Sequence, residues 1–162
     1  MTSAQGAPGT SQANLRRQIA MRPAELEAFT HERLTATMCT LNGDGTIHAV
    51  AMWYGFLDGA LAFETNTKSQ KAQNLRRNEN LTVSIEDGEV YEELRGCTLI
   101  GRGEIIEEPE RVFDLCRDVY ERYTRPYTES DRAFVEGMMR KRVVVKLHVD
   151  STATWDHRKL RG

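Results

Sequence analysis

Short β-prone segments joined by tight, glycine-containing turns constrain the fold of this chain most. Residues 34–41 alternate between apolar and polar side chains, and an Asn-Gly-Asp-Gly turn at 42–45 separates them from a second segment, 46–56. Glycine and asparagine allow the positive φ angles that hairpin turns need. A further turn at 57–59 leads to a third segment, 60–64. Three strands in direct succession predict an antiparallel meander or barrel.

The rest of the chain alternates further strands with short helices. We expect strands at 81–86, 94–107 and 143–149, and helices at 23–32, 69–78, 109–123 and 131–138. The glycines within 94–107 predict bulges or bends, which a tightly curved barrel requires. The pattern predicts a mainly β (α+β) fold, a six-stranded antiparallel barrel with short peripheral helices.

One domain, residues 21–162, accounts for these elements. Residues 1–20 are rich in Ser, Gly, Ala, Gln and Thr, and we expect a disordered N-terminal tail there. A formal net charge of -2 argues against general binding to nucleic acid or to a membrane surface. The apolar runs are shorter than the roughly 20 residues of a membrane span. Because no signal-peptide pattern follows the N-terminus, we expect a cytoplasmic protein.

The cysteines and histidines do not suggest a metal site. Cys39, Cys97 and Cys116 form no Cys-x-x-Cys pair, and with four scattered histidines they give no zinc-ligand spacing. Each cysteine lies among apolar or β-prone neighbours, so we interpret them as buried packing residues. No nucleophile–base set stands out either, and we assign no catalytic residue.

The segment from Thr65 to Arg77 has the composition of an anion site. Small hydroxyl and amide residues follow the third strand, and an amphipathic helix then begins, so unpaired backbone N–H groups are expected at its start. The segment contains Lys68, Lys71, Arg76 and Arg77 and no acidic residue. A solvated helix surface usually mixes charges of both signs. The segment therefore predicts a site for a phosphate group.

Several motifs together resemble a known superfamily. They are the hairpin with an Asp-Gly turn, the strand His-Ala-Val-Ala-Met-Trp at 48–53, FETNTKSQKAQNL at 63–75, ELRGCTLIGRGEI at 93–105, and a C-terminal tryptophan followed by arginine. In this order, over about residues 24–160, they resemble the split β-barrel superfamily of pyridoxamine 5′-phosphate oxidase-like, flavin- and deazaflavin-dependent proteins. The compact size and the Trp-Asp-His-Arg-Lys-Leu tail are most similar to the actinobacterial branch, which uses coenzyme F420 as hydride donor.

The resemblance implies a homodimer with the cofactor in a groove between the subunits. The strand at 48–53 would lie along the ring system, mainly through backbone contacts, and the turn at 65–69 would reach the phosphate. The C-terminal tryptophan and arginine would come across the dimer. The residues expected at the cofactor are His48, Val50, Ala51, Met52, Trp53, Thr65, Asn66, Thr67, Lys68, Ser69, Lys71, Asn74, Arg77, Trp155 and Arg158.

The same resemblance favours coenzyme F420 over FMN. The oxidase family typically has Ser-Arg-Lys where this chain has Ser69-Gln70-Lys71, and glutamine lacks the bidentate fork of arginine for a phosphate dianion. The run Lys71-Ala72-Gln73-Asn74-Leu75 matches the Lys-x-x-Asn-Leu pattern of the deazaflavin branch. That cofactor also carries a lactyl-glutamate tail with several carboxylates, for which the arginines at 76 and 77 are candidate partners.

The leading hypothesis is an F420-dependent reductase that transfers a hydride to a small organic acceptor. An FMN-dependent oxidoreductase on the same scaffold and a non-catalytic deazaflavin carrier are the alternatives, and a haem-binding version of the barrel is a distant third. Tyr54, His48 and water remain open as the proton source for the acceptor.

Overall fold

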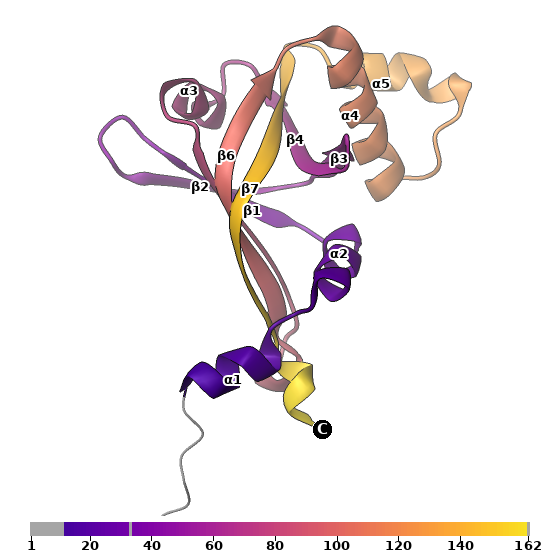
Figure 1. The fold of residues 1–162 in the computed structure, drawn as a ribbon. Helices are drawn as coiled ribbons and strands as arrows, with labels where there is room; N and C mark the ends of the chain where they lie inside the picture. The colour runs from indigo at the N-terminus through magenta and orange to yellow at the C-terminus, as the bar shows by residue number, and fades with distance from the viewer. Residues whose placement is uncertain (1–11, 33, 162) are drawn as a thin grey trace, which may run out of the picture.

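The computed structural model describes residues 12–32 and 34–161, and its central feature is one curled antiparallel sheet (Figure 1). The strand order is β2-β1-β5-β6-β7-β4-β3. The strands are β1 (Ala36–Leu41), β2 (Ile47–Met52), β3 (Gly55–Leu57), β4 (Ala60–Asn66), β5 (Asn80–Asp87), β6 (Arg95–Ile106) and β7 (Arg142–Asp156). The helices are α1 (Gln12–Ile19), α2 (Pro23–His31), α3 (Gln70–Arg77), α4 (Pro109–Tyr123) and α5 (Arg132–Met138). Short 3₁₀ turns are η1 (Tyr91–Glu93), η2 (Glu129–Asp131) and η3 (His157–Arg161).

The described chain has seven strands, so the prediction of six is wrong. The predicted strand 46–56 is broken at Trp53 and Tyr54 into β2 and β3. Tyr54 is fully buried, and its hydroxyl donates to the carbonyl oxygen of Thr30 at 2.9 Å. This burial takes the residue out of the ladder. The antiparallel barrel-type fold itself is confirmed as a half-barrel with short helices around it.

The break places two halves of one predicted strand at opposite edges of the sheet. β2 is the first strand of the sheet order and β3 is the last. Only two residues separate them in sequence, so the sheet must curl until its edges approach each other. The curl leaves β2 paired with β1 on one side only.

The long antiparallel pair of β6 and β7 forms the spine of the molecule (Figure 1). Its register runs from Arg95 opposite Asp156 to Ile106 opposite Val144, with a shift between Ile100 and Gly101. The bulge expected among these glycines is therefore present. The predicted last strand, 143–149, is too short because β6 continues to pair with residues whose polar composition does not by itself indicate a strand.

Two hydrophobic clusters lie on the two faces of the sheet. Met38, Phe63, Val83 and Leu147 pack with Phe29 of α2 in one cluster. In the other, Val112, Leu115, Cys116 and Val119 of α4 pack against Leu57, Ala62 and Val144. α4 has the bounds that the sequence predicts, since Val112, Leu115, Cys116 and Val119 recur at helical spacing. No helix in the described part of the chain is long and apolar enough to cross a membrane.

The N-terminal prediction is partly wrong. Residues 12–19, expected in a disordered tail, form α1, which lies against β7 and η3. The low-complexity composition belongs to the first eleven residues, whereas α1 (QANLRRQI) consists of residues that mostly favour helices. The expectation for residues 1–11 falls outside the described residues.

We predict that Gly101→Ala lowers the free energy of unfolding by about 1–3 kcal/mol, because overpacking at a fixed backbone forces local distortion. A β-carbon at Gly101 would overlap the backbone carbonyl of His148 on β7. Gly137→Ala is the matched control, since nothing lies within 4 Å of a β-carbon there. Urea unfolding followed by tryptophan fluorescence measures both variants. Equal midpoints for the two would contradict the assigned register.

Candidate functional site

The turn between β4 and α3 is held in shape by its own polar side chains. The Ser69 hydroxyl caps α3 by accepting from the backbone N–H of Ala72 at 3.3 Å, and it lies 3.2 Å from the Thr65 hydroxyl. The side-chain oxygen of Asn66 accepts from the backbone N–H of Lys68 at 2.9 Å. Within the described residues, the backbone N–H groups of the first two residues of α3 have no acceptor. The turn thus presents free donors at a helix N-terminus, as the sequence predicts.

Lys71 brings a poorly solvated positive charge to this turn. Burial lowers the pKa of Lys71; nearby Glu64 opposes this shift, whereas Arg142 adds to it. The Glu64 side chain is only 16% exposed and forms an ion pair with Arg142, and burial raises the pKa of its carboxyl group. An anion beside Lys71 would stabilise the charged ammonium group and compensate for the hydration that it loses on burial. Sequence reasoning missed both Glu64 and Arg142, because strand pairing alone brings the latter here.

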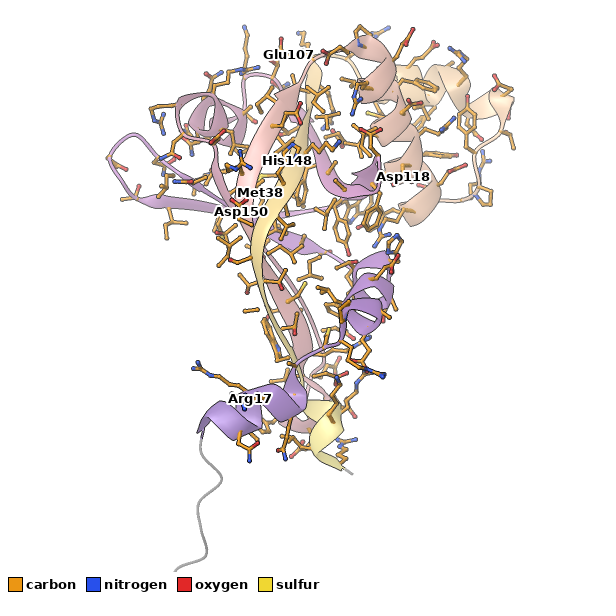
Figure 2. All side chains as sticks on the ribbon, in the orientation of Figure 1. Arg17, Met38, Glu107, Asp118, His148 and Asp150 are labelled. Atoms are coloured by element: carbon orange, nitrogen blue, oxygen red, sulfur yellow. The ribbon has the colours of Figure 1, made fainter. Side chains whose placement is uncertain are left out.

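The two arginines near the end of α3 have structural partners. Arg76 donates to the carbonyl and hydroxyl oxygens of Thr67 at 2.7 and 3.0 Å and pairs with Glu107 at 2.7 Å. Figure 2 shows Glu107 near the end of β6 that faces α4. Arg77 donates to the carbonyl oxygen of Leu41 at 2.6 Å. Both guanidinium groups therefore brace the turn and the β1–β2 hairpin.

Asn74 joins α3 to the same hairpin. The side chain is fully buried, and its nitrogen donates to the Thr40 hydroxyl at 3.0 Å and to the Asn42 side-chain oxygen at 2.9 Å. Its oxygen accepts from Gln70 at 2.9 Å and from Arg77 at 3.1 Å. Both donors and both acceptor sites of the amide are used within the protein. Asn74 thus positions the helix over β1 and β2.

β2 offers an open edge below α3. His48 lies opposite Thr40 in the register, and the Thr40 hydroxyl accepts from Asn74. His48, Val50 and Met52 are half-buried on the inner side of the strand, whereas the side chains between them are exposed. The outer backbone edge of β2 has no pairing strand in the described part of the chain. Such an edge can hydrogen-bond to the polar rim of a flat ring.

Trp53 ends this edge next to α4. Its indole is 57% exposed and stacks on the ring of Tyr123, with ring centroids 4.6 Å apart and planes within 4°. The Tyr123 hydroxyl donates to the carbonyl oxygen of Leu34 at 2.6 Å, which holds the stack in place. One face of the Trp53 indole is thus covered by Tyr123.

The two C-terminal residues predicted at the site lie at the opposite end of the molecule from α3. Trp155 is half-buried and packs on Gly96, and Arg158 pairs with Asp156 at 2.7 Å. Figure 1 shows this end of β7 beside α1, far from α3. A single chain therefore does not bring Trp155 and Arg158 to the turn at 65–69.

The three cysteines are free thiols. Burial raises the pKa of Cys97 to about 11 and that of Cys116 to about 12, so both thiols stay protonated and unreactive at neutral pH. Their buried packing role is confirmed, whereas Cys39 is only half-buried. In the described residues, no group of three His, Cys, Asp or Glu side chains is placed to hold a metal ion.

Fold and site define a half-barrel in which a turn with free helix N–H groups and lysines adjoins a hairpin with an open strand edge. The family model described as pyridoxamine 5′-phosphate oxidase matches residues 23–156. The chain belongs to this family, as the sequence motifs indicate.

Solved structures place the chain among relatives of differing function. It is 44% identical to the conserved hypothetical protein Rv2991 from Mycobacterium tuberculosis, over 91% of this chain and 92% of that one, with a TM-score of 0.88. A protein described as an F420 reductase is 26% identical over 81% of this chain and 98% of its own, with a TM-score of 0.61. The haem storage protein HutZ from Vibrio cholerae shares the fold at 14% identity, over 84% and 95% of the two chains, with a TM-score of 0.64. No curated protein matches the chain.

We predict that Asn74→Ala lowers the free energy of unfolding by about 1–3 kcal/mol, because it leaves buried polar partners unsatisfied. Gln73→Ala, on the exposed side of the same helix, removes only a 3.4 Å hydrogen bond to the Thr67 carbonyl and serves as the control. Thermal unfolding monitored by circular dichroism compares the two. An Asn74 variant as stable as the control would rule out the positioning role.

Proposed function

We propose that this protein is a coenzyme F420-dependent reductase that acts on a small organic acceptor. The observation that carries the proposal is the turn at 65–71, where free helix N–H groups and the half-buried Lys71 come together, on a helix that Asn74 and Arg77 tie to the β1–β2 hairpin. Membership of a family of flavin-type enzymes and the 26% identity to an F420 reductase support it. When bound, the reduced deazaflavin would supply the hydride, and the protein would supply position, charge and exclusion of water.

The residues present suit such a cofactor. Ser69, Lys68 and Lys71 would hold the phosphodiester, with Thr65, Asn66 and Thr67 shaping the turn beneath it. The β2 segment from His48 to Trp53, including Val50, Ala51 and Met52, would lie along the ring.

FMN is the second candidate and is less well supported. Its phosphate is a dianion, and Gln70, which stands where the oxidase family has arginine, donates to Asn74 at 2.9 Å. The turn therefore offers the ammonium groups of Lys68 and Lys71, but no guanidinium group that could bind a phosphate through two parallel hydrogen bonds. A deazaflavin carrier would use the same contacts and would differ only in lacking turnover.

We further propose that the protein acts as a homodimer through the outer face of its sheet. The residues on this face are small or apolar: Ile47, Ala49 and Ala51 of β2, Cys39 and Leu41 of β1, Thr82 of β5 and Ile100 of β6. Ile47 is 69% exposed and Ile100 is 46% exposed. A two-fold arrangement would cover this face and bring Trp155 and Arg158 of the partner subunit toward the cofactor, which one chain alone does not achieve.

Side-by-side titration with coenzyme F420 and FMN, followed by cofactor fluorescence, tests the cofactor assignment. We expect tight binding of F420 and weak binding of FMN. Preference for FMN would reassign the protein to the flavin-dependent members. Oxidation of the reduced deazaflavin in the presence of quinone or nitroaromatic acceptors then separates a reductase from a carrier, which would bind without turnover.

We predict that Lys71→Ala weakens F420 binding about ten-fold or more, because a charge-assisted hydrogen bond contributes roughly 1.5–3 kcal/mol. Glu64→Gln should strengthen F420 binding, because it removes a negative charge near Lys71 that would repel an anion there. Equilibrium titration of both variants measures the effect. Unchanged affinity in a folded Lys71 variant would refute the phosphate assignment.

We predict that Ile100→Glu converts the protein to a monomer and reduces F420 affinity together with dimerisation. A buried charge on each side of a two-fold interface is unfavourable. Phe134→Glu is the control, because Phe134 is 62% exposed on α5, away from this face. Sedimentation analysis across a concentration series reads the oligomeric state. A dimer that persists in the Ile100 variant would place the interface elsewhere.

A further inference from the structure

A second basic segment lies next to the turn between β4 and α3. The backbone N–H of Thr67 donates to the carbonyl oxygen of Lys141 at 2.8 Å, and Asn66 lies opposite Arg142 in the β4–β7 register. The sequence Arg140-Lys141-Arg142, which follows α5 and leads into β7, therefore adjoins the turn that carries Lys68 and Lys71. Nothing in the local sequence of either segment indicates this proximity.

The cations of these two segments are unusual in lacking partners. Most lysines and arginines of the described chain form ion pairs, for example Arg95 with Glu32 and Lys159 with Glu25. The described lysines and arginines whose side chains have no hydrogen bond or direct ion pair are Arg16 and Arg17 on α1 and Lys68, Lys71, Arg140 and Lys141. Four of these six residues thus belong to the two adjoining segments. The nearby acid, Glu64, is already paired with Arg142.

The backbone at Lys141 supplies an independent reason to look for a ligand. Its φ is 55°, in the left-handed region, where a lysine costs about 1 kcal/mol relative to glycine. The next residue, Arg142, is held by its side chain, which donates to the carbonyl oxygen of Met138 at 2.9 Å. The turn keeps a long cationic side chain at a position that favours glycine or asparagine. This points to a use for the side chain.

We infer that Arg140 and Lys141 bind carboxylates on the part of the cofactor that extends beyond its phosphate. The inference rests on the proposed function and extends it from the phosphate to the acidic tail. The arginines at 76 and 77, the candidates from sequence, are engaged by Thr67, Glu107 and Leu41. Arg140 and Lys141 belong to the segment that hydrogen-bonds to Thr67 of the turn, so a tail that leaves the turn toward β7 would meet them.

The test compares two ligands and three proteins by equilibrium fluorescence titration. The ligands are coenzyme F420 with one glutamate and with several glutamates in its tail. The proteins are the wild type, the double variant Arg140→Ala with Lys141→Asn, and the charge-matched control Arg117→Gln with Arg132→Gln on α4 and α5. Asparagine tolerates the positive φ at 141, so the backbone of the turn is preserved.

We expect the wild type and the control to bind the long-tailed ligand more tightly than the short-tailed one. The double variant should lose about ten-fold in affinity for the long tail and little for the short tail, with the difference shrinking as salt is added. Lys71→Ala, in contrast, should weaken both ligands equally.

Three results would count against the inference. Equal affinity of wild type and double variant for the long tail overturns it and leaves the proposed function intact. An equal loss for both ligands assigns the turn to the phosphate and overturns the tail assignment. Failure of the wild type to bind either ligand overturns the proposed function, and the inference with it. Circular dichroism melts of each variant verify that the comparison is made on folded protein.

Discussion

The two-residue link between β2 and β3 is the constraint on which the rest of the structure depends. Tyr54 is buried between α2 and the sheet, and the Arg122 guanidinium lies 4.4 Å from the centre of its ring. After this residue the chain continues in β3, which lies at the opposite edge of the sheet. The sheet must therefore curl, and α3 packs against β1 and β6 of the curled sheet. The free edge of β2 is a consequence of that geometry.

Buried polar contacts then fix α3, and with it the turn proposed to bind an anion, to the β1–β2 hairpin. Asn74 uses all four of its hydrogen-bonding positions to hold α3 to β1 and to the following turn. Unsatisfied amides are costly inside a protein, so this arrangement tolerates little movement. Lys68 and Lys71 of this turn have no hydrogen bond or direct ion pair within the described residues. A protein with a net charge near zero can in this way present a local positive field to an anionic ligand.

Single-chain geometry is also the basis for proposing a site shared by two subunits. The spine formed by β6 and β7 is long, and it carries Trp155 to the end opposite α3. The outward side chains of β1, β2 and β5 are mostly small or apolar, and no element in the described part of the chain covers them. These observations are complementary, because a two-fold partner would both cover the face and supply the distant end.

The sequence by itself determined the elements whose signals are local. Helix α4 follows from a proline start and an apolar stripe, the β1–β2 hairpin from its turn residues, and the phosphate-type turn from its free donors and lysines. Only the tertiary structure decided that one predicted strand is split, that β7 continues to Asp156, and that Arg140 and Lys141 adjoin the turn before α3. These features depend on pairing between segments far apart in sequence, and local composition carries no information about such pairing.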